Sequence, residues 1–333
     1  MYNEGRKSEF MQANGLDQWK FRWASSTFNS VEHMEEKLGK DIAEMTADEV
    51  GKALATSDII SSSTLSNRIP FIVRYKLWCA EQGYPSLVVE SGDIHVDVSD
   101  NIRETMVCSE KELAKILEQG FPELSANDSK CIYKAHLWLG FAGMQDLDSV
   151  RARVSDVDFN QNSVFLDNKM YYFPQEGKRD IRHACEMKVF DRVMDGKPRS
   201  FRRSYDDRIL RGRITKKVID DKQYLVKTLR CSVRLGMIAA GRAGMSYIRI
   251  RRSGIFREAF KREVKGIPVN FFQVAHDDFV FEGKHATQGQ TKQKILRRII
   301  LAYEKDYEAW KRAFEKELLE EFKLDKLPHQ FDW

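Results

Sequence analysis

The sequence predicts a mainly α-helical protein with a small β-hairpin, an α+β fold arranged as two domains. Three observations support this prediction. Long stretches before residue 85 and after residue 185 have helical spacing of apolar and charged side chains. Residues 162–174 alternate as a strand pair does, and residues 86–108 contain only short β-branched runs and acids. The apolar content of 42% is enough for packed cores in a chain of 333 residues.

The first domain is predicted to be a small helical unit spanning residues 1–85. Residues 30–54 show helical spacing, and Thr46 with Glu49 has the S/T-x-x-E form of a capping box. A further helix is expected over 66–84, where a glycine and then a proline end the pattern.

The second domain is predicted to span residues 109–333, after an extended linker at 86–108. Ser109 and Glu112 have the form of a second capping box, which starts a helix. The stretch 129–144 is strongly apolar, so we expect it to be a core helix of this domain.

A β-hairpin is predicted next, followed by helices to the end of the chain. The stretch 162–174 turns at Asp167-Asn168, a dipeptide that favours tight hairpin turns. From about residue 185 the pattern is mainly helical, and residues 295–322 form a long amphipathic helix or a helix pair.

Composition argues against several classes of protein. No stretch approaches the roughly 18 apolar residues of a membrane span, and the first residues have no secretory signal. The five cysteines are scattered without a CxxC pair, which indicates reduced thiols in a cytoplasmic protein. The sequence contains no P-loop, dinucleotide, zincin or hydrolase motif and no metal-ligand cluster, so we expect no cofactor and no metal.

Positive charge is concentrated in one part of the chain. Residues 178–265 contain 26 Lys and Arg against 10 Asp and Glu, whereas the whole chain carries a net charge of only +5. An excess of this size attracts a polyanion, and double-stranded DNA is the partner we expect. The candidate DNA-contacting residues are Arg68, Arg74, Lys76, Arg199, Arg202, Arg203, Arg211, Arg213, Lys216, Lys217, Arg249, Arg251 and Arg252. A base-reading helix is expected within 66–78 or 199–217.

The order of these pieces resembles the tyrosine recombinase (phage integrase) family over roughly residues 15–310. The best local match is AGMQDLDSVRARVSDVDF (142–159), where the family has a T-G-L-R-x-S-E-L box followed by a W-x-D-I-D-like segment. The end of this stretch, VSDVDF, fits the family pattern. The position of the box arginine falls on Gln145, which can donate a hydrogen bond but carries no charge.

The resemblance implies a set of positions around a scissile phosphate. In the family, arginines, a lysine and histidines stabilise the phosphate while a tyrosine attacks phosphorus. Here Lys169 matches the hairpin lysine, and IRIRRS matches the second box with Arg251 in place but Ile248 at its histidine. The third-box histidine matches His276, and the position of the nucleophile, nine residues later, falls on His285.

The resemblance therefore implies a DNA-binding protein that has lost strand cleavage, similar to recombinase-fold lysogeny repressors of temperate phages. Two alternatives stay open. One is an active recombinase that uses Tyr303 or Tyr307 as nucleophile, although their spacing of four also fits packing on one helix face. The other is a helical interaction protein with an acidic partner. A protein or peptide effector and weak oligomerisation through the C-terminal helix are further expectations, with a monomer as the alternative.

Overall fold

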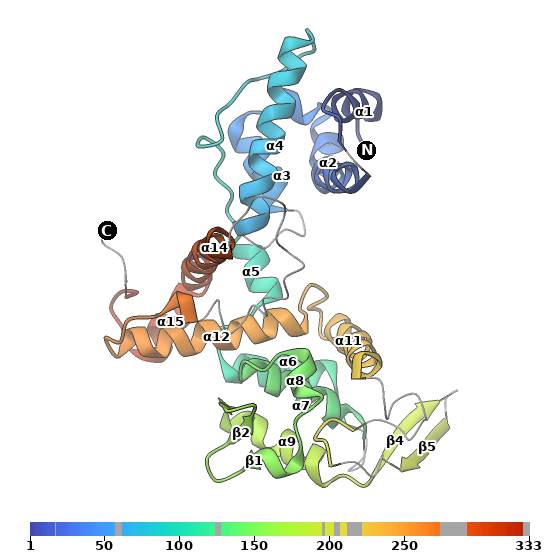
Figure 1. Ribbon diagram of the computed structural model, residues 1–333, viewed down its shortest axis with the longest axis vertical. Helices are drawn as coiled ribbons and strands as arrows, with labels where there is room; N and C mark the ends of the chain where they lie inside the picture. The colour runs from blue at the N-terminus through green and yellow to red at the C-terminus, as the bar shows by residue number, and fades with distance from the viewer. Residues whose placement is uncertain are drawn as a thin grey trace. The chain divides into compact units, whose positions relative to one another are not determined.

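The computed structural model describes residues 1–333 except 17, 57–61, 124–127, 195–196, 203–206, 212–221, 274–291 and 329–333. The chain divides into two compact units (Figure 1). The first consists of the described residues of Met1–Ile102 and Phe281–Ala313, and the second of those of Arg103–Val280 and Phe314–Trp333. The predicted fold class is confirmed: the molecule is mainly helical with small antiparallel sheets.

The first unit is a helical bundle around an aromatic core. The Phe28 ring packs against Phe71 and Tyr75 with centroids 5.3 and 4.9 Å apart, and Phe10 packs against Tyr75 at 5.2 Å. Aromatic side chains from three helices therefore hold this unit together. Its elements are α1 (Glu4–Ala13), α2 (Gln18–Leu38), η1 (Ile42–Glu44), α3 (Ala47–Ala55), α4 (Ser62–Glu81) and α14 (Lys292–Ala313).

Two sequence predictions for this unit are confirmed. Thr46 caps α3: its hydroxyl accepts from the Glu49 N–H at 3.3 Å, while Glu49 accepts from the Thr46 N–H at 2.8 Å. Helix α4 covers the predicted stretch 66–84 up to Glu81 and is followed by Gly83, whose φ of +77° ends the turn.

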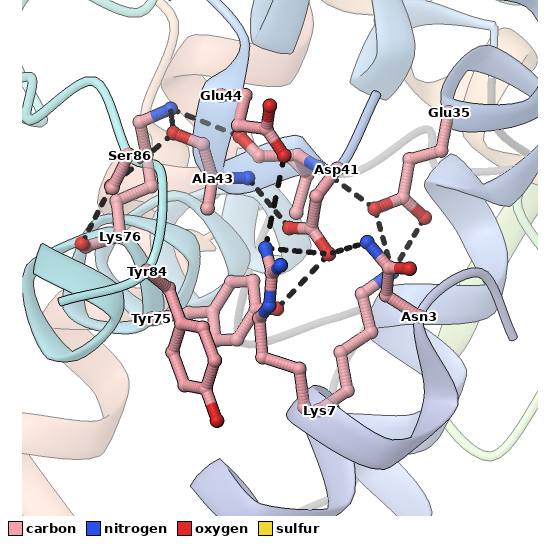
Figure 2. A network of polar contacts seen from close by, with 12 residues as sticks. Asn3, Lys7, Glu35, Asp41, Ala43, Glu44, Tyr75, Lys76, Tyr84 and Ser86 are labelled. Atoms are coloured by element: carbon pink, nitrogen blue, oxygen red, sulfur yellow. Dashed lines mark hydrogen bonds and ion pairs between the residues drawn. The ribbon is translucent and has the colours of Figure 1, made fainter. Parts of the chain in front are cut away.

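A buried polar network fixes α1 and the η1 turn onto α2 and α4 (Figure 2). The Lys7 ammonium donates to both carboxylate oxygens of Glu35 at 2.6 and 2.5 Å, and both side chains are fully buried. Glu35 also accepts from the Ile42 N–H at 2.8 Å. Asp41 accepts from the Ala43 N–H at 2.8 Å and from the Tyr75 hydroxyl at 3.2 Å. Burying these charges is tolerated because each has partners.

The second unit is built on two packed helices, α7 and α12, surrounded by α11, by shorter helices and by short strands. Its small sheet has the strand order β1-β2-β3, and a separate hairpin pairs β4 with β5. Its elements are α5 (Ser99–Thr105, which begins in the first unit), α6 (Glu110–Gly120), α7 (Lys130–Phe141), α8 (Asp146–Ser149), η2 (Val154–Asp156), β1 (Val157–Asp158), β2 (Ser163–Leu166), β3 (Lys169–Tyr172), η3 (Gln175–Gly177), α9 (Lys178–Glu186), β4 (Val189–Met194), β5 (Lys197–Arg202), α11 (Lys222–Ala239), α12 (Tyr247–Val264) and α15 (Glu315–Phe322).

The predicted hairpin and helix start of this unit are confirmed. Asp167 and Asn168 both have positive φ, at 50° and 61°, so they form the two-residue turn between β2 and β3. The Ser109 hydroxyl accepts from the Glu112 N–H at 3.1 Å. Glu112 reaches back one residue further than predicted, to the Cys108 N–H at 2.9 Å.

Two glycines permit close contacts between helices in the second unit. A Cβ on Gly254 of α12 would lie 1.8 Å from the Phe141 carbonyl oxygen at the end of α7. A Cβ on Gly236 of α11 would lie 2.2 Å from the ring of Phe121, next to the end of α6. The α7–α12 pair, on which the rest of this unit packs, therefore requires glycine at position 254.

Helix α15 docks on α12 of its own chain through ion pairs and rings. Arg257 is 5% exposed and donates to the Glu321 carboxylate, and the rings of Phe260 and Phe322 meet edge to face at 5.1 Å. Arg103 holds Glu317 through two hydrogen bonds of 2.6 and 3.1 Å. The predicted "long helix or helix pair" over 295–322 is a pair, and its two members belong to different units.

Two details differ from the sequence predictions. Residues 189–202 form a hairpin, not a helix, since β4 and β5 pair antiparallel from Val189↔Arg202 to Met194↔Lys197. The domain boundaries also differ from 1–85 and 109–333: the linker contains helix α5, and α14 packs on α4 within the first unit.

We expect Gly254→Ala to lower the free energy of unfolding by about 3 kcal/mol, because the new methyl group meets a backbone carbonyl that cannot rotate away. Chemical denaturation measures the loss. Gly5→Ala is the matched control, because Gly5 lies in α1 and a Cβ added there would meet no atom within 4 Å. Equal stability of the two variants would contradict the close packing of α7 and α12.

The Lys7–Glu35 pair predicts a pH-dependent stability of the first unit. Burial raises the pKa of Glu35 to about 7, against the opposing effect of Lys7. The folded state therefore keeps a proton that the unfolded chain loses near pH 4.5, so stability falls as pH rises from about 4.5 to 7, by at most about 3 kcal/mol. Denaturation of the wild type and of the double variant Lys7→Met, Glu35→Leu at several pH values tests this. The same pH slope in both proteins would refute the assignment.

Candidate nucleic-acid interface

In the first unit, α4 carries the predicted cationic residues and packs against α2. The two helices are joined by the rings of Trp23 and Phe71, 5.0 Å apart, and by a 2.7 Å hydrogen bond from Arg68 to the Ser30 hydroxyl. Arg68 is half-buried, and burial lowers its pKa. Arg74 is exposed and donates to the Asn14 amide oxygen at 2.5 Å. Of the residues predicted on α4, Arg74 is the one most accessible to a phosphate.

The prediction that Lys76 contacts DNA is wrong, because its side chain is buried and has a structural role. Its side chain is fully buried, and its ammonium donates to the carbonyls of Ile42, Ala43 and Met45 at 2.9, 2.9 and 2.7 Å. Burial lowers the pKa of Lys76 to about 8. The ammonium therefore closes the carbonyl end of the η1 turn and does not face a ligand (Figure 2).

The basic stretch of the second unit is only partly described. Arg199 is exposed on β5, the backbone of Arg202 ends the same strand, and the Arg211 guanidinium donates to the Cys185 carbonyl at 2.6 Å. The prediction that 199–217 contains a base-reading helix is wrong for its first residues, because 199–202 are strand. Four further predicted contacts lie outside the described residues: Arg203, Arg213, Lys216 and Lys217.

At the first box, the position of the family arginine is a helix start. Gln145 is the N-cap residue of α8, and the next residue, Asp146, is buried. Asp146 forms an ion pair with Arg230 of α11. Burial raises the pKa of Asp146, and Arg230 opposes the shift. The Asp146 carboxylate, next to Gln145, therefore forms an ion pair with an arginine from another helix.

Lys169 and Arg251 line the same cavity, whose volume is about 700 Å³. Lys169 follows the hairpin turn at the start of β3, and its ammonium lies 5.2 Å from the centre of the Tyr171 ring. Arg251 lies on α12, is 7% exposed and donates from Nε to the Gly143 carbonyl at 2.9 Å. The structure thus brings together the two cations that the family pattern predicts, whereas Gln145 is not among the residues lining this cavity.

At the second box, the histidine position holds an apolar side chain that faces solvent. Ile248 is 55% exposed in the first turn of α12, and its neighbours Arg249 and Arg252 are partly exposed. The imidazole that packs against the start of α12 belongs to His136, which is fully buried against Tyr247 with ring centres 4.2 Å apart. Its Nδ1 lies 3.1 Å from the Ser149 hydroxyl.

Neither of these two buried rings is suited to proton transfer with a ligand. Burial, with a smaller effect of Arg230, lowers the pKa of His136 to about 3. The Tyr247 hydroxyl donates to the Met144 carbonyl at 3.0 Å, and burial raises its pKa. Both rings therefore pack the junction of α7 and α12 in neutral form.

The remaining predicted positions lie elsewhere. His276 and His285 fall outside the described residues. Tyr303 and Tyr307 lie on α14 in the first unit and are buried, with Tyr307 stacked on Trp310 at 6.1 Å. Their position fits the interpretation that their spacing of four reflects packing.

Helix α11 presents a cationic face that the sequence predictions missed. Lys227, Arg230 and Arg234 are exposed on this face, and Arg230 also forms the ion pair with Asp146. Their spacing of three and four residues places them on one side of the helix. The signal was present in the sequence as K-T-x-R-x-x-x-R, opposite the apolar positions Leu225, Val226 and Leu229, which are buried.

Comparison with known proteins gives a match that lies within the first unit. Residues 1–81 match the family model of the MrpR N-terminal core-binding domain, a tyrosine recombinase-like N-terminal domain. This match supports DNA binding on a recombinase-like scaffold. A search of curated proteins found no match to the chain.

Across the described part of the chain, no group of metal-ligating side chains occurs and no helix is long and apolar enough to cross a membrane.

We expect His136 to stay neutral across pH 5 to 8, because protonation would place a charge in a fully buried site near Arg230. Its folded pKa lies below the unfolded value near 6.5, so the second unit loses stability as pH falls through the range from 6.5 to 3. The nitrogen shifts of the imidazole, followed by NMR during a titration, measure this. A transition near pH 6.5 in the folded protein would show that the ring is accessible.

Proposed function

We propose that the protein is a sequence-specific, double-stranded DNA-binding protein on a tyrosine recombinase scaffold, and that it acts as a repressor without cleaving DNA. The main observation behind this proposal is which residues occupy the family's site positions in the second unit. Lys169 and Arg251 line one cavity, whereas the arginine and histidine positions of the boxes hold Gln145 and Ile248. These residues support a site that keeps phosphate-binding cations and has lost an arginine and a histidine that cleavage uses in the family the sequence resembles.

The missing groups matter because each one acts on the transition state. Removing a single preorganised donor from such a site typically costs on the order of 3 kcal/mol in the barrier. A histidine at position 248 would move protons, and the buried His136 cannot replace it because its ring is covered by Tyr247. Binding has no such requirement, since it needs charge and hydrogen bonds alone.

Base recognition requires a helix that can enter the major groove. In the first unit, the match to a core-binding domain favours α2 and α4, where Arg22 and Arg74 are exposed. In the second unit, the exposed face of α11 with Lys227, Arg230 and Arg234 is the stronger candidate. Two base-reading helices on two units would let one chain contact one site twice, which increases both affinity and specificity.

A regulator of this kind acts by occupying its site, so we propose a repressor of the lysogenic type, encoded by a prophage and located in the cytoplasm. The sequence supports this through its resemblance to recombinase-fold repressors that have lost the same groups. Control by a protein or peptide effector and weak self-association through the C-terminal helix belong to the same proposal. The cis contacts of α15 with α12 favour the monomer in the absence of DNA.

The proposal predicts duplex binding that weakens steeply with salt, with a slope of about −0.9 per phosphate contact. We expect Arg234→Ala to weaken binding to the preferred sequence by about tenfold, as loss of one charged contact does. Arg179→Ala is the matched control, because Arg179 is also exposed in the basic stretch but is paired with Glu118 and Asp180. Gel shifts against genomic fragments measure both variants. Binding that is insensitive to salt would favour the acidic protein partner instead.

Cleavage is tested separately with a nicked suicide substrate. We expect no covalent protein–DNA adduct, and equal duplex binding by the wild type and the variant in which Tyr303 and Tyr307 are both replaced by Phe. An adduct that disappears in this double variant would establish the active recombinase and overturn the repressor proposal.

A further inference from the structure

Strand β3 forms the edge of its sheet, and its backbone borders the cavity of about 700 Å³. Among the described residues the sheet has the order β1-β2-β3, so β3 pairs with β2 on one side alone. All four residues from Lys169 to Tyr172 line the cavity, and Phe173 and Pro174 continue the lining. Side chains of a strand alternate between two faces, so a cavity facing one face touches every second residue. An unbroken run of lining residues shows that the strand's edge faces the cavity.

The register of the hairpin fixes which backbone groups point toward this edge. The Phe173 N–H donates to the Asn162 carbonyl at 2.8 Å, which directs position 173 toward β2. In an antiparallel pair this direction alternates along the strand. Tyr171 therefore also faces β2, and the N–H and C=O groups of Met170 and Tyr172 point away from it. These groups form the hydrogen-bonding template that a further strand requires.

Helix α12 also lines the cavity. Arg251, Ile255, Glu258 and Arg262 line it at spacings of four, three and four residues. Charged residues in the lining are unequally divided, with five cations against two acids: Lys169, Arg251, Arg257, Lys261 and Arg262 against Glu110 and Glu258.

Glu110 already forms ion pairs within the protein. It pairs with Arg257 at 2.5 Å and with Lys261 at 2.8 Å, and these hydrogen bonds, against the effect of burial, lower the pKa of Glu110 to about 2. Glu258 likewise pairs with Arg262, and Glu321, outside the lining, pairs with Arg257. The lining keeps a net charge of +3, from five cations and two acids, and this charge would favour carboxylates in the cavity. Apolar lining from Phe141 and Val269 provides contacts for uncharged side chains between them.

We infer that this cavity binds an extended acidic peptide segment of a partner protein, which adds to β3 as a fourth strand. Backbone pairing with Met170 and Tyr172 would supply affinity, and the net positive charge of the lining would select acidic side chains. A nucleic acid cannot satisfy the template, because its backbone lacks alternating amide donors and carbonyl acceptors. The inference does not depend on DNA binding, although an acidic peptide in this position would occupy the space next to Lys169 and Arg251.

The test uses the full-length protein and the fluorescein-labelled peptide GEVEVEG, with GKVKVKG as the charge control. We expect saturable binding of the acidic peptide by fluorescence anisotropy and none of the basic one. Met170→Pro, which removes an outward N–H at an edge position that tolerates proline, is expected to weaken binding about tenfold. Met170→Val retains the N–H and is its matched control. Arg262→Glu is expected to weaken binding by a similar factor, and Arg179→Glu, outside the cavity, is expected to have no effect.

A second measurement covers the case in which the proline variant does not fold. N-methylation of the central glutamate and its flanking valines in the peptide removes its own donors without changing the protein, and we expect this peptide not to bind. Hydrogen exchange should show slower exchange of the Met170 and Tyr172 amides in the presence of GEVEVEG alone. Absence of binding up to about 1 mM peptide would overturn the inference.

The same hydrogen-exchange measurement distinguishes two other occupants of the cavity. Protection of the Met170 and Tyr172 amides that rises with protein concentration, without peptide, would identify a second copy of the chain and overturn the inference. Protection of these amides by a DNA duplex but not by the peptide would also overturn it. Because duplex binding is measured in its own gel shift, failure of the peptide leaves the DNA-binding result unaffected.

Discussion

The second unit depends on the contact between the backbone of α12 at Gly254 and the Phe141 carbonyl at the end of α7. One turn before this contact, Arg251 donates to the Gly143 carbonyl, and one turn further back the Tyr247 hydroxyl reaches the Met144 carbonyl. Three successive turns of α12 are thus fixed to the end of α7 and the start of the first box. The cation of the candidate site is positioned by backbone contacts, so its place does not rely on a mobile loop.

The protein uses many of its cations internally. Lys76, Arg211, Arg242 and Arg251 donate to backbone carbonyls, and Arg257 and Lys7 form buried ion pairs. A basic stretch in a sequence therefore overstates the charge that a polyanion meets. The exposed cations on α11 and the cavity cations differ in their surroundings. The first lie on an open helix face that suits a duplex, and the second line a partly apolar cavity in which Lys169 and Arg251 suit a phosphate and the edge of β3 suits an extended chain.

Local sequence signals predicted local structure well. The capping box at Thr46, the Asp167-Asn168 turn and the core helix ending near Gly143 each follow from residues close in the chain. The β4–β5 hairpin was missed although Asp195-Gly196 is a hairpin dipeptide, because the flanking arginines hid the alternation. The burial of Lys76 and the Asp146–Arg230 pair join residues 31 to 84 positions apart, which no local pattern reveals.

Helix α14 follows more than half of the second unit in the chain, yet it packs on α4 of the first. The polypeptide thus passes from one unit to the other, returns, and crosses again before α15. A fragment cut after residue 102 would leave uncovered the surface of α4 that α14 occupies. A fragment that ends at residue 102 is therefore an incomplete folding module, and the nascent chain can complete the first unit only after α14 has left the ribosome.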